Sequence, residues 1–358
     1  MYKIIYILIT LILLTSCHSN IEPAVDNNII ESNELDNYDI LYPYDYTNSR
    51  YWFTNTLSKS DAIHMPKTLQ ELSLDYFSAE ENLLVPGKFL LYDDIQMLQR
   101  RKSKTYPYAL NPAEGDYSIN PTVTIDAPYL INGIYELNFM SKLDKETNTG
   151  ISIAIMLNNK YVRKYENYNN DNTISDLDLV QYSKLISETL SDYLRIEKGI
   201  DYNIPILITT YKNSNDKLYV PGNFISKNLF INDKVEFETI NEKWYLFPSA
   251  ELKLVDSILY NEFISIKNQI ENFLPESVSM IGQTRYFDDY IQSVNLEIRL
   301  QSKSYNETYS LVQYVKDLVQ NYDDKDYNIT IDIKQYDETS FVISKNKNDN
   351  EFILIDMN

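Results

Sequence analysis

The sequence predicts an α+β fold with α/β character, in which two related strand-helix-strand units with mixed, mainly antiparallel sheets follow a loop-rich helical N-terminal region. Three observations support this class. Hydrophobic residues make up 44% and aromatic residues 13% of the 358 positions, enough apolar area for a folded core. Apolar runs of period two alternate with longer runs of helical period, as in a sheet covered by helices. The second half of the chain also repeats several short motifs in one order.

The first residues have the features of a secretory signal peptide, which we place at 1–16. A basic residue precedes an apolar run over 4–14, and the small residues Thr15 and Ser16 follow it. The run is shorter than the roughly 20 apolar residues that cross a bilayer, so it does not predict a transmembrane helix.

The segment Leu14-Thr15-Ser16-Cys17 resembles the bacterial lipobox, and Cys17 is the single cysteine of the chain. The resemblance implies cleavage by signal peptidase II between Ser16 and Cys17 and a diacylglyceryl group on the Cys17 sulfur. Two or three acyl chains such as palmitate bind a membrane stably, whereas one chain binds marginally. We therefore expect a lipoprotein anchored to the extracellular face of the cell membrane. The alternative is a chance cysteine in an ordinary signal peptide.

Residues 17–40 are polar and acidic and show no apolar periodicity. They predict a flexible tether, which like charges extend and anionic lipid head groups repel. Residues 41–150 contain seven prolines and predict a loop-rich subdomain with helices over 48–61, 67–81 and 93–101.

The clearest internal signal is a repeat between residues 151–250 and 291–358. The matched motifs are 151–157 with 294–300, 179–182 with 311–314, 201–206 with 326–331, and 225–228 with 343–346. Each unit should run strand, helix, strand and then a hairpin, with 235–238 pairing 243–247 and 341–345 pairing 352–356. Between the units, at 251–290, we place a connector that contains a bridging helix over 250–273, ended by Pro275.

Composition excludes several classes of function. The net charge of −20 and the pI near 4.5 argue against nucleic acid as a partner, because phosphate backbones require basic side chains. One cysteine and two histidines cannot form a disulfide framework or a Cys/His zinc site. The 7 scattered glycines form no phosphate loop, so no cofactor is expected.

Acidic and histidine side chains are the candidates for catalytic or metal-binding groups. Asp289, Glu297 and Glu251 show no spacing that identifies a glycosidase pair, which requires two carboxylates in one cleft. The 170–178 cluster of Asn and Asp could attract Ca²⁺, but it lacks the glycine and glutamate of an EF-hand loop. Ser175 or Asp176 is more simply the N-cap of the following helix. His64, between predicted helices, is interpreted as a surface or packing residue.

The 32 tyrosines allow two interpretations. Tyrosine-rich surfaces can bind peptides or glycans, because the ring offers contact area and the hydroxyl forms hydrogen bonds. Alternatively, they reflect general composition, since Tyr182, Tyr211, Tyr314 and Tyr336 occupy repeat positions suited to cores.

Several stretches of the second half resemble the CamS family of lipoproteins from low-GC Gram-positive bacteria, known as sex-pheromone precursors. The matching stretches are 151–164, 204–212 with 221–225, 240–243 with 246–249, 343–345, and the tripeptide 110–112 ahead of Gly115. The family implies no catalytic role for the mature chain. It implies that the cleaved signal peptide yields a short apolar peptide, here Thr10 to Ser16.

This heptapeptide departs from the family pattern at Thr10, Ile12 and Thr15, where the pattern has Ala, an aromatic residue and Ala. The alternative fate is simple degradation of the signal peptide. For the mature chain we expect a non-enzymatic, membrane-anchored lipoprotein without metal. The alternatives are a binding module for cell-wall glycan or an extracellular peptide, with a tyrosine-lined groove between the repeats, and a weak hydrolase.

Overall fold

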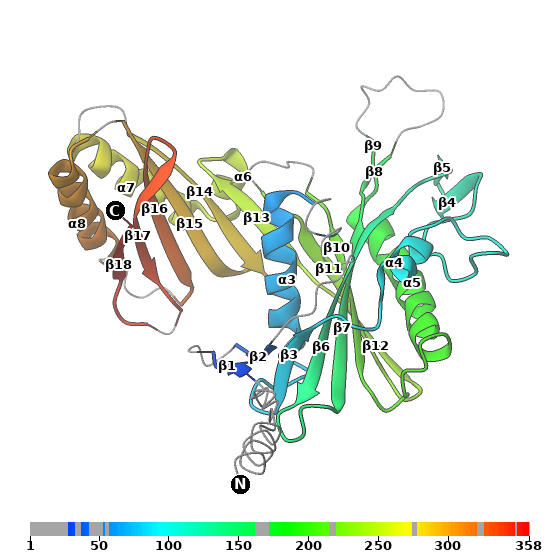
Figure 1. The fold of residues 1–358 in the computed structure, drawn as a ribbon. Helices are drawn as coiled ribbons and strands as arrows, with labels where there is room; N and C mark the ends of the chain where they lie inside the picture. Colours follow the sequence, from blue (N-terminus) through cyan, green and yellow to red (C-terminus); the bar gives the residue numbers. More distant parts are fainter. Residues whose placement is uncertain are drawn as a thin grey trace, which may run out of the picture.

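Two large mixed sheets organise the chain in the computed structural model (Figure 1). The structure describes residues 28–32, 37–42, 53, 57–161, 172–214, 220–273, 278–301, 303–320, 326–347 and 349–357. Helices pack on these sheets, and the predicted α+β class is confirmed.

The first sheet has the strand order β1-β2-β3-β6-β7-β10-β11-β12. The strands are β1 (Asn28–Ile30), β2 (Asp39–Tyr42), β3 (Asn82–Pro86), β6 (Ile131–Ser141), β7 (Asn148–Leu157), β10 (Ile206–Lys212), β11 (Asn223–Ile231) and β12 (Lys234–Thr239). Helix α5 (Asp176–Ile196) connects β7 to the parallel strand β10, whereas β6, β11 and β12 pair antiparallel with their neighbours.

Helices cover both faces of this sheet, which explains why β7 is buried on both faces from Gly150 to Leu157. Alternate residues of β7, such as Ile153 and Ile155, pack with α5. The intervening residues Ala154 and Met156 pack with α3 (Lys59–Ser73). Figure 1 shows α3 and α5 on opposite sides of the sheet.

The second sheet has the order β13-β14-β15-β16-β17-β18. The strands are β13 (Glu242–Phe247), β14 (Val278–Phe287), β15 (Tyr290–Leu300), β16 (Asn328–Gln335), β17 (Glu338–Lys345) and β18 (Ile353–Asp356). Helices α7 (Ser257–Phe273) and α8 (Tyr305–Gln320) pack on one face, where Phe263, Ile266, Leu311 and Val315 meet the strands.

The two sheets repeat one connectivity, which confirms two related units. In the first, β6 and β7 form a hairpin, α5 leads to the parallel strand β10, and β11 and β12 follow antiparallel. In the second, β14, β15, α8, β16, β17 and β18 follow the same path. The repeat in the sheets starts at β6 and β14, before the predicted starts at 151 and 291.

The predictions for residues 41–150 need two corrections. Residues 41–150 are not mainly helical, because β3, β6 and the start of β7 belong to the first sheet, and β4 (Asp116–Asn120) and β5 (Val123–Asp126) form a small hairpin. One helix, α3, runs across the gap between the two predicted helices over 48–61 and 67–81, and it contains Pro66. The third prediction, 93–101, corresponds to α4 (Tyr92–Leu98).

Part of the predicted tether is also structured. Strands β1 and β2 extend the first sheet, and β2 pairs with β3. Tyr38 is buried against Phe139 and donates a hydrogen bond to the Phe77 carbonyl, while Asp39 forms an ion pair with Lys142 at 2.6 Å. A buried aromatic ring and a paired carboxylate hold this segment on the first sheet. An acidic composition alone therefore does not predict a flexible tether here.

The connector between the sheets also differs from its prediction. The bridging helix is two helices, α6 (Ala250–Val255) and α7, because Asp256 leaves helical geometry and its side chain accepts from the Leu259 N–H at 2.8 Å. The expected hairpin of 235–238 with 243–247 is wrong, since β12 pairs with β11 and β13 pairs with β14. The hairpin of β17 with β18 is confirmed, and Pro275 lies outside the described residues.

The repeated strand motif at 201–206 is mostly a turn, since β10 begins only at Ile206. A short hairpin of β8 (Lys160–Tyr161) and β9 (Asn172–Thr173) precedes α5. Ser175 is the N-cap of α5, as one of the two alternatives predicted, and its side chain accepts from the Asp178 N–H.

Candidate functional site

The predicted lipidation site lies outside the described residues. Leu14, Thr15, Ser16 and Cys17, and with them the whole heptapeptide Thr10 to Ser16, therefore stay sequence-based expectations. Among the described residues, no helix has the length and apolar character needed to cross a membrane.

A network of polar and charged side chains, buried except for Glu71, joins the two sheets. Glu242, the first residue of β13, accepts hydrogen bonds from His64 Nε2 at 3.0 Å, Arg285 Nε at 2.6 Å and the Phe224 backbone N–H at 2.7 Å. Arg285 of β14 also donates to Glu71 Oε2 at 2.7 Å. Since His64 and Glu71 belong to α3, the network links α3, the first sheet and the second sheet.

Electrostatics explain why a carboxylate is stable in this place. Burial alone would raise the pKa of Glu242, but the hydrogen bond from His64 and the positive charge of Arg285 outweigh it and lower that pKa. Burial would likewise lower the pKa of Arg285, but Glu242 and Glu71 raise it. The pair is therefore charged, with three donors satisfying the Glu242 carboxylate.

A second polar cluster lies beside the first on α3. Asp61 Oδ1 accepts from the Tyr211 hydroxyl and from the Gly222 N–H, both at 2.7 Å. Burial, followed by the charge of Asp61, raises the pKa of Tyr211 well above its ordinary value. Asp61 is itself fixed by Ser58, the N-cap of α3, whose hydroxyl lies 2.8 Å from Asp61 Oδ2.

These clusters connect elements that are distant in the sequence. The side chain of Glu242 is fully buried and Tyr211 is buried. The interpretation of His64 as lying between helices is wrong: it is inside α3, where its ring packs edge-on against Trp244 and reaches Glu242. Its partner is 178 residues away in sequence, so no local signal could reveal it.

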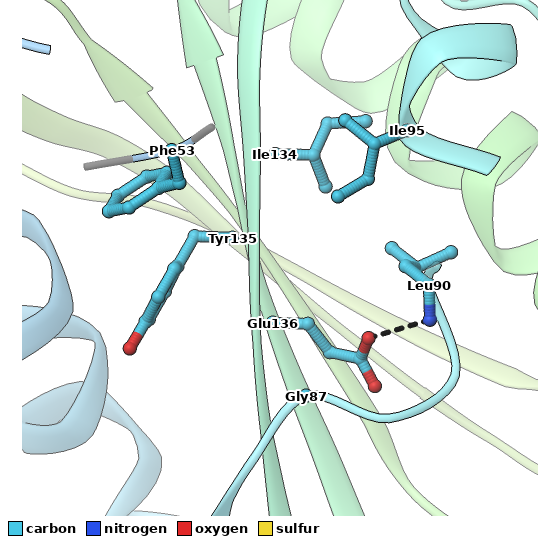
Figure 2. A pocket seen from close by; sticks show the side chains of 7 residues that line it. All are labelled: Phe53, Gly87, Leu90, Ile95, Ile134, Tyr135 and Glu136. Carbon is cyan, nitrogen blue, oxygen red and sulfur yellow. Dashed lines mark hydrogen bonds between the residues drawn. The ribbon is translucent and has the colours of Figure 1, made fainter. Parts of the chain in front are cut away.

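A third buried carboxylate, Glu136, borders a small pocket of about 20 Å³ (Figure 2). Its oxygens accept from the backbone N–H groups of Lys88, Phe89 and Leu90 at 2.8 to 3.2 Å and from the Asn138 amide. Burial raises the pKa of Glu136 even though these hydrogen bonds oppose the shift. Glu136 holds the loop that follows β3.

The remaining lining of this pocket is apolar. Figure 2 shows Ile134, Ile95 and Leu90 on one side of β6, and Tyr135 with Phe53 on the other. The Tyr135 and Phe53 rings have centroids 4.6 Å apart. A single carboxylate with all its oxygens hydrogen-bonded gives this pocket no acid-base pair.

A wider hollow of about 700 Å³ opens where β14 turns into β15. Three tyrosines and four aspartates line it, together with Lys347: Tyr286, Tyr290, Tyr327, Asp256, Asp288, Asp289 and Asp326. Tyr290 is 75% exposed, whereas the Tyr286 hydroxyl donates to Asp256 at 3.1 Å. The hollow belongs to the second unit, whereas the tyrosine-lined groove was predicted between the units.

The repeat tyrosines divide between core and surface. Tyr182 and Tyr211 are buried as predicted, and Tyr314 is half-buried and stacks on Phe273 at 4.4 Å. Tyr336 is exposed, because it occupies the turn between β16 and β17 with a positive φ of 51°.

The acidic residues considered as a glycosidase pair lie in three different elements, although Asp289 and Glu251 both lie near Tyr245, whose pKa is raised by burial and then by their two charges. Glu297 in β15 forms ion pairs with Arg299 and Lys334, Asp289 lies in the β14–β15 turn, and Glu251 is in the first turn of α6. Within the described part of the chain, no three His, Cys, Asp or Glu side chains are grouped so as to hold a metal. Residues 170 and 171 of the Asn/Asp cluster lie outside that part.

Comparison with solved structures finds the same fold. The sex pheromone precursor from Lactobacillus salivarius subsp. salivarius UCC118 is 23% identical, with a TM-score of 0.78 over 92% of this chain and 99% of that chain. The C-terminal domain of the sex pheromone staph-cAM373 precursor from Staphylococcus aureus is also 23% identical, with a TM-score of 0.68 over 84% and 97%. No curated protein sequence matches this chain.

The repeated units and the buried network at their junction define a double-sheet α+β protein whose two halves are fastened by charged side chains. The chain belongs to the family described as CamS sex pheromone cAM373 precursor, whose profile matches residues 44–351.

Proposed function

We propose that this chain is a non-catalytic lipoprotein, anchored through Cys17 on the extracellular side of the membrane, and that its leader is the precursor of a pheromone peptide. The observation that carries the proposal is membership of the CamS sex pheromone precursor family together with the lipobox-like segment Leu14-Thr15-Ser16-Cys17. Enclosed carboxylates at the junction and at Glu136 support a structural role for the folded part.

The anchor is tested with Cys17→Ala, which removes the only sulfur that can accept the lipid. We expect the variant to lose labelled palmitate and to accumulate as the unprocessed precursor. Ser16→Ala is the matched control, because alanine keeps a small residue before the cut and should leave processing unchanged. A mature, acylated, membrane-bound Cys17→Ala chain would refute the anchor.

The peptide is tested separately with synthetic heptapeptide Thr10 to Ser16. Donor cells that carry a pheromone-responsive plasmid should show a mating response to this peptide and none to a scrambled peptide of the same composition. Failure of every responsive strain to react would leave the anchor standing but remove the pheromone role.

The tyrosine-lined hollow favours a second candidate function, the binding of a cell-wall glycan. Exposed Tyr290 offers a ring face for a sugar, and neighbouring aspartates offer acceptors for its hydroxyls. Retention of the full chain on purified peptidoglycan should fall with Tyr290→Ala but not with Tyr336→Ala, an equally exposed tyrosine in the β16–β17 turn. Equal retention of both variants and the wild type would exclude this hollow as the binding site.

A further inference from the structure

The hollow at the β14–β15 turn differs in charge from two other hollows of the described chain. Four aspartates and one lysine line its volume of about 700 Å³, which gives three net negative charges. A hollow of about 360 Å³ beside α3 has two glutamates and one lysine, and one of about 450 Å³ at the β16–β17 turn has two basic residues and one aspartate. Those two hollows are within one charge of neutral, so the acidity of the whole chain does not explain the charge of the first.

The aspartates of this hollow differ in how far they are already engaged. Both oxygens of Asp256 accept hydrogen bonds within the chain, one from a backbone N–H and one from the Tyr286 hydroxyl. Asp326 lies 3.4 Å from Lys347 Nζ. Asp288 is exposed, and its carboxylate has no hydrogen bond or ion pair with any described residue. The carboxylate of Asp288 is therefore available to a ligand.

An unused hydroxyl is a second, independent feature of this hollow. Tyr327 lines the hollow but is only 7% exposed, and its hydroxyl has no hydrogen-bond partner among the described residues. Buried hydroxyls in folded proteins usually have a partner, because burial without one is unfavourable. Tyr286, in the same lining, has such a partner in Asp256. Tyr327 therefore offers the hollow a hydrogen-bonding group that the chain itself does not use.

Carboxylates act on both of these tyrosine hydroxyls. Burial, followed by the charges of Glu262 and Asp256, raises the pKa of Tyr327. Burial, followed by the charge of Asp256, likewise raises the pKa of Tyr286. Both hydroxyls are therefore neutral and lie in a negative potential, which attracts a cationic group and repels an anionic one.

We propose that this hollow binds the ammonium group of a lysine side chain from an extracellular peptide. The proposal deepens the second candidate function, since it rests on binding at the same hollow but assigns a cationic ligand in place of a neutral glycan. A lysine ammonium has three donors and no acceptor, which suits the Asp288 carboxylate and the oxygen of the Tyr327 hydroxyl. Exposed Tyr290 offers its ring face to the same cation.

The burial of Tyr327 favours lysine over an amino sugar. A lysine ammonium is carried on a flexible four-carbon stem, which can pass apolar ring surfaces while its charge reaches a recessed hydroxyl. The amine of a sugar is attached directly to a ring and lacks this reach. Lysine is therefore the cationic group that fits both the exposed and the recessed parts of the lining.

A metal ion fits the same residues less well. Over the part of the chain that the structure describes, no three His, Cys, Asp or Glu side chains are grouped so as to hold a metal, so the four aspartates form no such site. Calcium requires six to eight oxygen ligands around one point. An ammonium group requires only one nearby carboxylate and further acceptors.

Calorimetric titration of the full-length chain with a tri-lysine peptide tests the proposal. The salt concentration is about 0.15 M, where charges beyond about 8 Å are largely screened. The Nε-acetylated peptide is the neutral probe, and a glucosamine trimer is the amino-sugar probe. The lysine peptide should bind at least about tenfold more tightly than either, because it alone brings a charged donor to Tyr327.

Variants locate the binding site. Tyr327→Phe keeps the ring, removes the hydroxyl and should weaken binding of the lysine peptide about tenfold. Asp288→Asn removes the free carboxylate and should weaken it about threefold. Asp233→Asn is the matched control, because it removes the same charge from an exposed residue in the β11–β12 turn and should leave the affinity unchanged. Circular dichroism confirms that each variant is folded.

Several results would overturn the proposal. These are no binding of the lysine peptide to the wild type, equal binding of either other probe, and an unchanged affinity in Tyr327→Phe. Equal losses in Asp288→Asn and Asp233→Asn would also overturn it, because they would show attraction to the overall charge of −20. The glycan candidate is decided separately by retention on peptidoglycan: a chain that binds the lysine peptide but is not retained there upholds this proposal alone.

Discussion

His64 Nε2 lies 3.0 Å from Glu242 Oε1, and this contact joins helix α3 to the first strand of the second sheet. Arg285 completes the link, because it bonds Glu242 on its own sheet and Glu71 on α3. The two sheets are thus fastened by hydrogen-bonded charges as well as by apolar packing.

Loss of the Glu242 charge should destabilise the chain strongly. In Glu242→Gln, Arg285 and His64 lose their buried anionic partner, and the free energy of unfolding should fall by about 3 kcal/mol. Urea unfolding followed by circular dichroism measures this. Glu71→Gln is the control, because Glu71 is partly exposed, and it should cost less than about 1 kcal/mol. Equal losses in the two variants would contradict the central position of Glu242.

Glu242 should also determine how the free energy of unfolding depends on pH in the acidic range. Its pKa in the folded chain is below the ordinary value of 4.5, so its ionised form adds stability above pH 4.5. This stability is lost as the pH falls below 4.5 through the lowered pKa. The difference in unfolding free energy between wild type and Glu242→Gln should therefore shrink over that acidic range. A difference that stays constant would show that Glu242 is not ionised in the folded chain.

The fold could be predicted where the pattern is local. The period of two in β7 and β15 and the helical stripes of α5 and α8 depend on nearby residues, and so did the repeat that revealed the two units. The partners of β12 and β13 could not be predicted, since a short polar link is compatible with either a hairpin or a crossing between sheets. The buried contacts of Glu242 decide that choice.

The candidate sites were harder to predict for the same reason. Asp61 and Tyr211 are 150 residues apart, and Glu136 meets its backbone donors 46 to 48 residues away. The chain has 52 acidic residues, and the residues next to a given carboxylate do not indicate whether it is buried. Only the tertiary fold distinguishes these few residues from the solvated majority.

Glu136 should show the opposite pH dependence from Glu242. Burial raises its pKa above the ordinary value of 4.5, so its protonated form is favoured by folding. Its contribution to stability is present below pH 4.5 and is lost as the pH rises through the raised pKa. Relative to Glu136→Gln, wild type should therefore become less stable over that rise. Thermal unfolding across this range tests the sign, and a rise in relative stability would contradict it.

Gly222 should tolerate no side chain. A Cβ there would lie 2.1 Å from the Lys212 carbonyl oxygen, and this backbone atom cannot move without disturbing the pairing of β10 with β11. Gly222→Ala should cost about 3 kcal/mol or more of unfolding free energy. In Gly133→Ala the first atom met is Met156 Sδ at 2.6 Å, on a flexible side chain, so the cost should be smaller. The denaturant midpoint should therefore fall further in Gly222→Ala than in Gly133→Ala, and equal midpoints would contradict this prediction.

Asp256 should stabilise the corner between α6 and α7 by two separate bonds. Its Oδ1 accepts from the Leu259 N–H at 2.8 Å, and its Oδ2 accepts from the Tyr286 hydroxyl at 3.1 Å. Asp256→Ala should cost about 2 kcal/mol, because both a helix cap and a bond to the second sheet are lost.

Two variants separate these contributions. Asp256→Asn keeps an acceptor for the Leu259 N–H and should recover most of the cap, whereas Ser249→Ala removes only the cap of α6 and should cost about 1 kcal/mol. The free energies of unfolding should therefore rank Asp256→Ala as the largest loss. If Asp256→Ala costs no more than Ser249→Ala, the bond to Tyr286 contributes nothing, and α7 is held on the second sheet by its apolar side chains, among them Leu259, Phe263 and Ile266.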